Sequence, residues 1–284
     1  MKIGLTTYSL SRLISKGEFT LCDIIRWGAE NGAEHIEIAP GKENLAENAP
    51  LCAEIRKTAS DCGVDLSSYT IGANFIQSDE EAFRKEIERV KREVDVAARL
   101  GVTRMRHDAG WRPPAEATCR NFDADLPKLA EACAEIADYA KPFGITTSVE
   151  NHGYHVQGSE RVQRLIYAVG RENFRTTLDV GNFLCVDEDP VSAVKNNISL
   201  ASMIHFKDFY VRKNLAVRNG FFETKHGNLL RGSIVGYGDI DIPAIVEVIR
   251  NSGYDSYISV EFEGMEECRE GTSIGIRMLK ELFA

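Results

Sequence analysis

A short apolar run rich in β-branched residues, followed by a longer stretch with helical periodicity, recurs along the whole of this 284-residue chain. The length and β-branched content of these runs favour strands over segments of buried helix. There are eight of them: KIGLTTYSL (2–10), HIEIAP (35–40), VDLSSYTIGA (64–73), TRMRHDAG (103–110), ITTSVENHG (145–153), FRTTLDVGNF (174–183), ASMIHFKDFY (201–210) and SYISVEFEG (256–264). Strands that alternate with helices in this way form right-handed βαβ units and a parallel sheet.

The intervening stretches carry the signals of amphipathic helices. The clearest is residues 79–101, where Asp79 is the expected N-cap and Gly101 the expected stop. Residues 123–144 and 242–253 have the same character. One apolar stripe follows the first of these helices: Phe83, Ile87, Val90, Val94 and Ala97. A glycine closes five of the helical stretches just before the next strand, as is typical of helix-to-strand turns in a parallel sheet: Gly32, Gly63, Gly101, Gly144 and Gly253.

Eight strand–helix units are the number that closes a (β/α)₈ barrel. The sequence therefore predicts an α/β fold, a TIM barrel that forms a single domain over residues 1–284. Its longest interval between strands predicts a long loop after the seventh strand, at about residues 211–238, which we expect to cover a pocket. An open doubly wound sheet is the alternative, but it usually has a Gly-rich phosphate turn after its first strand, and TTYSLSRL has none. The same absence favours a non-phosphorylated substrate.

Charge and cysteine content exclude several classes of function. The net charge of −9 argues against nucleic acid and anionic membranes as partners. No apolar run approaches the about 18–20 residues of a membrane span, and no signal peptide is expected in MKIGLTTYSL. The seven cysteines are scattered without a C-x-x-C pair, which predicts reduced thiols and a cytoplasmic protein. A homo-oligomer is compatible with the sequence, but no pattern in it fixes the number of subunits.

Four potential metal ligands end the last four predicted strands: Glu150, Asp179, His205 and Glu261. The active site of a TIM barrel lies at the carboxyl ends of its strands, so these side chains are expected to converge there. Three carboxylates that face one another repel, and a divalent cation removes that repulsion. Carboxylate oxygens with one imidazole nitrogen predict one Mn²⁺ or Mg²⁺ ion, with Co²⁺ or Zn²⁺ as alternatives.

The motifs at these strand ends, VENHG, LDVGN, IHFKD and SVEFEG, resemble those of the xylose isomerase-like TIM-barrel superfamily of sugar isomerases, epimerases and inosose dehydratase-like enzymes. The resemblance implies that Glu150, Asp179, His205 and Glu261 bind the metal. It also implies that Glu150 and Glu261 are catalytic and exchange protons with the substrate. Asn182 stands where many members have a histidine, which sets this chain apart from the tagatose-type epimerases.

Five further residues are predicted to contact the substrate: His152, Asn182, Lys207, Arg106 and Glu37. Side chains two residues apart on a strand share a face, which groups His152 with Glu150 and Lys207 with His205. Lys207 either stabilises an enediolate oxygen, holds a sugar hydroxyl, or forms an ion pair with Glu261 or Asp208. His152 either binds a hydroxyl or supports the metal site.

The resemblance implies a metal-dependent isomerase or epimerase that moves a proton next to a carbonyl through an enediolate. Its expected partner is a small sugar or polyol ketone. A lyase of the inosose dehydratase or 3-keto-glycoside type is the alternative, because the same enediolate can instead expel a β-substituent. An abasic-site endonuclease of this fold needs more histidine ligands, for three metal ions, than the six histidines of this chain supply. The net negative charge also disfavours binding to DNA. A sugar-binding barrel without activity is the remaining alternative.

Overall fold

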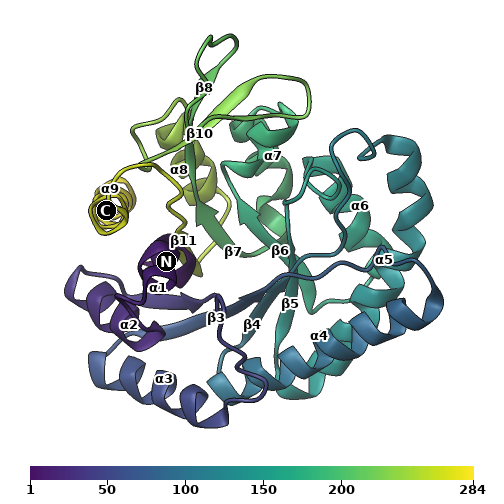
Figure 1. The fold of residues 1–284 in the computed structure, drawn as a ribbon, viewed down its shortest axis with the longest axis horizontal. Helices are drawn as coiled ribbons and strands as arrows, with labels where there is room; N and C mark the ends of the chain where they lie inside the picture. The colour runs from purple at the N-terminus through teal and green to yellow at the C-terminus, as the bar shows by residue number, and fades with distance from the viewer.

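Eight parallel strands close into a barrel in the computed structural model, which describes residues 1–284 (Figure 1). The strands are β1 (Lys2–Thr6), β2 (His35–Ile38), β3 (Asp65–Ile71), β4 (Arg104–His107), β5 (Thr146–Glu150), β6 (Phe174–Asp179), β7 (Ala201–Phe206) and β11 (Tyr257–Val260). Around the barrel their order is β1-β11-β7-β6-β5-β4-β3-β2. The (β/α)₈ barrel that the sequence predicts is therefore confirmed.

A helix follows every barrel strand and packs on the outside of the sheet (Figure 1). These helices are α1 (Ser11–Lys16) and α2 (Leu21–Glu30) after β1, then α3 (Ala49–Cys62), α4 (Glu80–Leu100), α5 (Cys119–Ala140), α6 (Ser159–Val169), α7 (Pro190–Asn197), α8 (Ile242–Asn251) and α9 (Cys268–Phe283). Four short 3₁₀ helices complete the set: η1 (Thr7–Leu10), η2 (Lys141–Phe143), η3 (Asn182–Val186) and η4 (Ile198–Leu200).

The helices begin and end close to the capping residues that the sequence predicts. Asp79 caps α4 by accepting a hydrogen bond from the backbone N–H of Ala82, and the predicted apolar stripe of that helix is buried. The five glycines predicted to end helices all have a positive φ, which side-chain-bearing residues seldom adopt. One boundary differs. α5 begins at Cys119 rather than at residue 123, because Thr118 supplies the N-cap.

The segment after β7 is not the long loop that the sequence predicts. It contains an antiparallel three-stranded sheet, order β8-β10-β9, made of β8 (Asp208–Arg212), β9 (Phe222–Glu223) and β10 (Leu229–Ser233). This sheet starts only one residue after β7 ends and projects beyond the barrel near α7 and α8 (Figure 1). Two glycines of this interval permit close packing: a Cβ on Gly232 would lie 2.3 Å from the Glu263 carbonyl oxygen, and one on Gly238 would lie 2.1 Å from Asp208 Oδ1.

The end of the barrel opposite the strand C-termini is packed solid. The ring of His35 is fully buried there, where its Nδ1 lies 2.8 Å from the hydroxyl of Ser67 and its Nε2 lies 2.9 Å from the carbonyl oxygen of Ile258. One contiguous cluster of 70 buried apolar residues joins the barrel to its helices. None of the helices combines the length and the apolar composition that crossing a membrane requires.

Candidate metal centre

The four side chains predicted to bind a metal meet in one place at the carboxyl ends of β5, β6, β7 and β11. One ligand atom from each of Glu150, Asp179, His205 and Glu261 lies within 4.8 Å of those of the other three. The register of the sheet brings these residues together. His205 on β7 is paired with Asp179 on one side and with Ser259 on the other, and Glu261 follows Ser259 by two residues. All four residues are buried. Together they form what we call the acidic cluster.

The two carboxylate oxygens of Asp179 have different surroundings. Its Oδ1 accepts hydrogen bonds from the backbone N–H groups of Gly181 and Asn182, both at 2.8 Å, whereas its Oδ2 has no hydrogen-bond partner. Burial raises the pKa of Asp179 to about 7, because the repulsion from Glu261 and Glu150 adds to it and the attraction of Lys207 only partly opposes it. Asp179 Oδ2 thus accepts no hydrogen bond and has the Lys207 ammonium, 3.6 Å away, as its cationic neighbour.

His205 is held from behind by Glu37. Its Nε2 lies 2.7 Å from Oε2 of Glu37, and its Nδ1, which has no hydrogen-bond partner, lies 3.3 Å from Oε2 of Glu261. Burial lowers the pKa of His205, but the carboxylates of Glu37 and Glu261 outweigh this and raise it well above its ordinary value. An ionised carboxylate only accepts hydrogen bonds, so Nε2 carries a hydrogen and Nδ1 is the atom that can bind a metal.

Glu37 is itself fully buried, and its carboxylate is saturated. It accepts hydrogen bonds from the hydroxyls of Thr70 and Ser259 in addition to His205. The expectation that Glu37 contacts the substrate is not supported by this position, because no atom of it is open to a ligand. Its sequence motif, HIEIAP, marks a polar residue on a buried strand but does not reveal which partner it meets.

Two cations border the acidic cluster. The ammonium group of Lys207 lies 3.2 Å from Glu261, 3.5 Å from Glu263 and 3.6 Å from Asp179. The guanidinium of Arg106 lies 2.7 Å from Oε2 of Glu150. Burial lowers the pKa of Lys207, but the surrounding carboxylates outweigh it and raise the pKa well above its ordinary value. With Glu37 the site holds four buried carboxylates beside these two permanent cations, and the raised pKa of His205 adds a third positive charge to the site.

The remaining predicted contacts divide into two groups. Asn182 joins the cluster, where its Nδ2 donates to Oε1 of Glu150 at 2.9 Å and its Oδ1 accepts from Lys207 at 3.3 Å. His152 stays at the rim, with its side chain 51% exposed, and its Nδ1 lies 3.3 Å from Asp108. Burial lowers the pKa of His152, but Asp108 outweighs this and raises it. The substrate-binding roles of these residues stay predictions.

Sequence reasoning missed two carboxylates of the site. Asp108 follows β4 and forms an ion pair with Arg106 at 2.9 Å. Glu263 faces Lys207 and has a side chain 32% exposed. The spacing in SVEFEG carries a signal for Glu263, because residues two apart on an extended chain point the same way as Glu261 and Glu263 do. No local pattern marks Asp108 as part of the site.

The residues present fit a divalent metal ion. Three buried atoms, Asp179 Oδ2, His205 Nδ1 and Glu261 Oε2, have no hydrogen-bond partner and belong to side chains that converge in the cluster. Asp179 Oδ2 and Glu261 Oε2 have only the ion-pair contacts with Lys207, at 3.6 Å and 3.2 Å, so a metal ion would give these oxygens and the imidazole nitrogen a closer partner. Carboxylate oxygens with a single imidazole are donors for hard or borderline divalent ions rather than for thiophilic ones. The acidic cluster can therefore bind a divalent metal.

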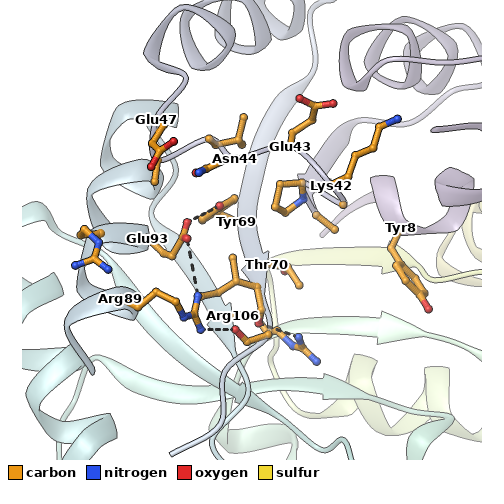
Figure 2. Close-up of a pocket in the computed structure, with 18 residues that line it drawn as sticks. Tyr8, Lys42, Glu43, Asn44, Glu47, Tyr69, Thr70, Arg89, Glu93 and Arg106 are labelled. Carbon is orange, nitrogen blue, oxygen red and sulfur yellow. Dashed lines mark hydrogen bonds and ion pairs between the residues drawn. The ribbon is translucent and has the colours of Figure 1, made fainter. Parts of the chain in front are cut away.

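A cavity of about 610 Å³ lies beside the acidic cluster, at the carboxyl ends of β2, β3 and β4 (Figure 2). The segment 39–47 after β2, the end of β3 and one face of α4 form its walls. Arg106 lines this cavity and also contacts Glu150 of the cluster. Arg106 thus lies between the cavity and the cluster and contacts both.

A family model described as "Xylose isomerase-like TIM barrel" matches residues 25–282. Inosose dehydratase of Lacticaseibacillus casei is 28% identical over 155 residues, which are 50% of this chain and 48% of that protein. The chain thus spans about half the length of the curated relatives it matches.

Two solved structures share the fold over nearly the whole chain. The probable 3-DHS dehydratase AsbF of Bacillus anthracis superposes with a TM-score of 0.77 at 18% identity, covering 99% of each chain. D-psicose 3-epimerase of Clostridium cellulolyticum H10 gives a TM-score of 0.75 at 14% identity, covering 100% of this chain and 99% of that one. At such identities the superpositions establish the architecture alone.

Proposed function

Because this chain belongs to the xylose isomerase-like TIM-barrel family, we propose that it is a metal-dependent sugar isomerase or epimerase. It moves a proton next to a carbonyl group through an enediolate. The observation that carries the proposal is the pair of buried glutamates, Glu150 on β5 and Glu261 after β11, which approach one cluster from strands three positions apart around the barrel. Two carboxylates placed on different sides of a substrate can remove and return a proton.

We propose that Glu150, Asp179, His205 and Glu261 hold one Mn²⁺ or Mg²⁺ ion, with Co²⁺ or Zn²⁺ as alternatives. When bound, such an ion polarises the substrate carbonyl and stabilises the negative charge that develops on its oxygen. The donor set supports this choice, since three of the four ligands are carboxylates and none is a thiolate.

The two glutamates have different surroundings, which supports different roles. Glu150 is fixed through both oxygens, by Asn182 and by Arg106. Burial raises the pKa of Glu261, but Lys207 and His205 outweigh it and hold the pKa well below its ordinary value. Glu261 is therefore ionised at neutral pH, which is the protonation state a general base needs, although a lowered pKa by itself makes it a weaker base. Return of the proton to the neighbouring carbon, which carried the carbonyl, gives an isomer, and its return to the original carbon from the opposite face gives an epimer.

Lys207 and Arg106 provide positive charge where the substrate must lie. The ammonium of Lys207 is buried between Glu261, Glu263 and Asp179. These three carboxylates share it, so its position is fixed by all of them and not by one close ion pair. A fixed ammonium there can donate a hydrogen bond to an oxygen of the enediolate. Arg106 can bind a hydroxyl at the border between the cluster and the cavity. His152, at the rim beside Asp108, can bind a hydroxyl farther from the reacting carbon.

A lyase is the second candidate, and the similarity to inosose dehydratase over half of the chain favours it. The first step is the same, because elimination also begins with loss of the proton next to the carbonyl. The outcome then depends on whether the substrate carries a leaving group at the β-carbon. Formation of a dehydrated product therefore distinguishes the lyase from the isomerase.

Solvent-isotope exchange tests the shared step. The protein loaded with Mn²⁺ is incubated in D₂O with a panel of ketoses, inososes and 3-keto-glycosides, and deuterium is followed by NMR in the product and in recovered substrate. We expect deuterium next to the carbonyl for at least one compound. Glu150→Gln and Glu261→Gln should each lower the exchange rate by at least about 100-fold, the usual contribution of a general acid or base.

Glu247→Gln is the matched control, because Glu247 is an exposed glutamate on the outer helix α8 without a polar partner. It should exchange at the rate of the unmodified protein. Turnover of a substrate without deuterium incorporation contradicts proton transfer as the mechanism. Undiminished rates in both active-site variants contradict the assignment of the two glutamates. Saturable sugar binding without turnover of any compound supports a binding protein instead.

A further inference from the structure

The cavity beside the acidic cluster is a space distinct from the reaction centre. Its volume is about 610 Å³, and none of the four cluster residues lines it. Pockets that hold an entire small molecule measure roughly 300–1,000 Å³. The cavity can therefore accept a chemical group in addition to the part of the substrate that reacts at the cluster.

Two side chains connect this cavity to the reaction centre. Arg106 lines the cavity and lies 2.7 Å from Glu150. Thr70 also lines it and donates its hydroxyl to Glu37, which in turn holds His205. Arg106 and Thr70 thus lie between the cavity and the cluster, so the cavity is the neighbouring space for a substrate whose carbonyl lies at the cluster.

One wall of the cavity is rigid. Tyr69 donates to Glu93 at 2.7 Å, and Arg89 donates to the carbonyl oxygen of Gly72 at 2.7 Å (Figure 2). Arg89 also forms an ion pair with Glu86 at 2.8 Å. The polar groups of this wall are satisfied by one another, so they shape the cavity rather than seek a ligand.

Other parts of the lining present polar side chains that have no partner within the protein. The side chains of Lys42, Glu43, Asn44 and Glu47 line the cavity and make no hydrogen bond or ion pair within the protein (Figure 2). The same is true of Arg92 on α4. Two cations and two anions among these residues leave no net charge, so an anionic group would meet as much repulsion as attraction.

Donors and acceptors in equal measure suit hydroxyl groups, each of which both donates and accepts hydrogen bonds. Tyr8 adds an apolar surface, since its side chain lines the cavity and the residue is 44% exposed. An exposed aromatic ring can pack on the C–H face of a sugar while the hydroxyls are bound at the edge. The lining therefore matches a neutral, polyhydroxylated ring better than a phosphate or an apolar group.

We propose that this cavity is a subsite for a second sugar ring, so that the substrate is a glycoside whose keto-bearing ring lies at the acidic cluster. The inference rests on the proposed function for the position of the reacting ring. It goes further, because it specifies a disaccharide-like ketone rather than a free ketose or inosose. Arg106 lies at the junction of the two rings, while Lys42, Asn44 and Arg92 bind the second ring.

The test compares pairs of ketones that share the reacting ring. 3-Ketosucrose and 3-ketocellobiose are each compared with the methyl 3-keto-glucoside of the same anomeric configuration, using deuterium exchange catalysed by the Mn²⁺-loaded protein. We expect kcat/KM to be at least about tenfold higher for one of the disaccharides than for its methyl glycoside, as one or two hydrogen bonds to charged side chains would give.

Three variants locate the preference. Asn44→Trp fills the cavity and should bring the ratio of the two kcat/KM values close to one. Lys42→Ala and Arg92→Ala should each lower this ratio about three- to tenfold. Lys85→Ala is the matched control, because Lys85 is an exposed, unpartnered lysine on the same helix as Arg92 but outside the cavity. The ratio should not change in that variant.

Equal kcat/KM values for the disaccharides and the methyl glycosides overturn the subsite, as does a ratio that Asn44→Trp leaves intact. If no ketone exchanges deuterium, the proposed function fails and the subsite is tested separately. In that case calorimetry follows binding of sucrose and cellobiose themselves. Binding retained in Asp179→Asn but lost in Asn44→Trp supports the subsite, and absence of binding by the unmodified protein overturns it.

Discussion

His205 and Glu37 are bonded across the interior of the barrel: Nε2 of the imidazole lies 2.7 Å from Oε2 of the carboxylate. The two residues are 168 positions apart in the sequence and lie on β7 and β2, which are separated by two intervening strands. This bond directs Nδ1 of His205 toward the acidic cluster. Glu37 is therefore a positioning residue, which acts on a bound metal only through the histidine.

Glu37→Gln should weaken Mn²⁺ binding about 10- to 100-fold, which is the usual effect of losing the partner of a metal-bound histidine. The amide has the shape of the carboxylate and can still accept one hydrogen bond, so the fold should persist. Isothermal titration calorimetry measures the change, and circular dichroism checks the fold. Ser259→Ala, which removes a hydroxyl 3.1 Å from the same oxygen, should have a much smaller effect. Equal affinities in Glu37→Gln and the unmodified protein would show that His205 is not a ligand.

Asp179→Asn should abolish stoichiometric metal binding. It replaces a free anionic oxygen by a neutral amide while preserving an acceptor for the N–H groups of Gly181 and Asn182. Asp208→Asn is the matched comparison, because Asp208 is equally buried but binds the backbone N–H groups of Gly236 and Gly238 instead. That variant should lower Tm and retain the metal. Elemental analysis after dialysis distinguishes the two, and metal retained by Asp179→Asn would refute the site.

Acid should destabilise the protein through His35. Burial lowers the pKa of His35 to about 4, although its hydrogen bond to Ile258 opposes this. Between about pH 4 and the unfolded value near 6.5, the unfolded chain binds a proton that the native state excludes. The contribution of the neutral ring is therefore complete above pH 6.5 and declines as the pH falls through this window.

His35→Gln provides the comparison for urea unfolding, because its side chain cannot take up a proton in this range. The free energy of unfolding of the unmodified protein, relative to His35→Gln, should fall by about 2 kcal/mol between pH 7 and pH 5. A relative stability that is constant over this range would show that His35 is protonated normally in the native state.

The three-stranded sheet after β7 should be anchored through Asp187. This residue has a φ of 61° and accepts hydrogen bonds from the backbone N–H of His226 and from the side chain of Asn228. Asp187→Ala removes both bonds and retains the strained backbone, so it should cost about 1–3 kcal/mol and accelerate amide exchange in residues 224–230. Asp187→Gly relieves the strain and should cost less with the same rise in exchange. Unchanged exchange in both variants would show that other contacts hold the sheet.

Most of the fold follows from local patterns in the sequence. The β-branched runs, the N-cap at Asp79 and the glycines such as Gly101 fix where strands and helices begin and end, because these preferences act over a few residues. The sheet between residues 208 and 233 was not predicted from the sequence, because its strands are short and its sequence is rich in glycine and charged residues. The pairing of β8 with β10 joins residues about 20 positions apart, from Leu229 with Arg212 to Ser233 with Asp208, which no local preference specifies.

The candidate site divides in the same way. Glu150, Asp179, His205 and Glu261 could be found from the sequence, because each ends a predicted strand and consecutive strands are neighbours in a (β/α)₈ barrel. The sequence also placed Asn182, Lys207 and Arg106 at strand ends. It could not assign Glu37, because a strand pattern shows that a residue is buried but not what it faces across the barrel.

The sequence by itself thus determined the architecture and the residues able to bind a metal. Only the tertiary structure decided that Glu37 holds His205, that Lys207 lies among three carboxylates, and that a cavity opens beside Arg106. The physical reason is that secondary structure and strand order arise from short-range preferences and hydrophobic periodicity. Hydrogen bonds, ion pairs and cavities arise from distances between side chains far apart in the chain, which become defined only once the barrel closes.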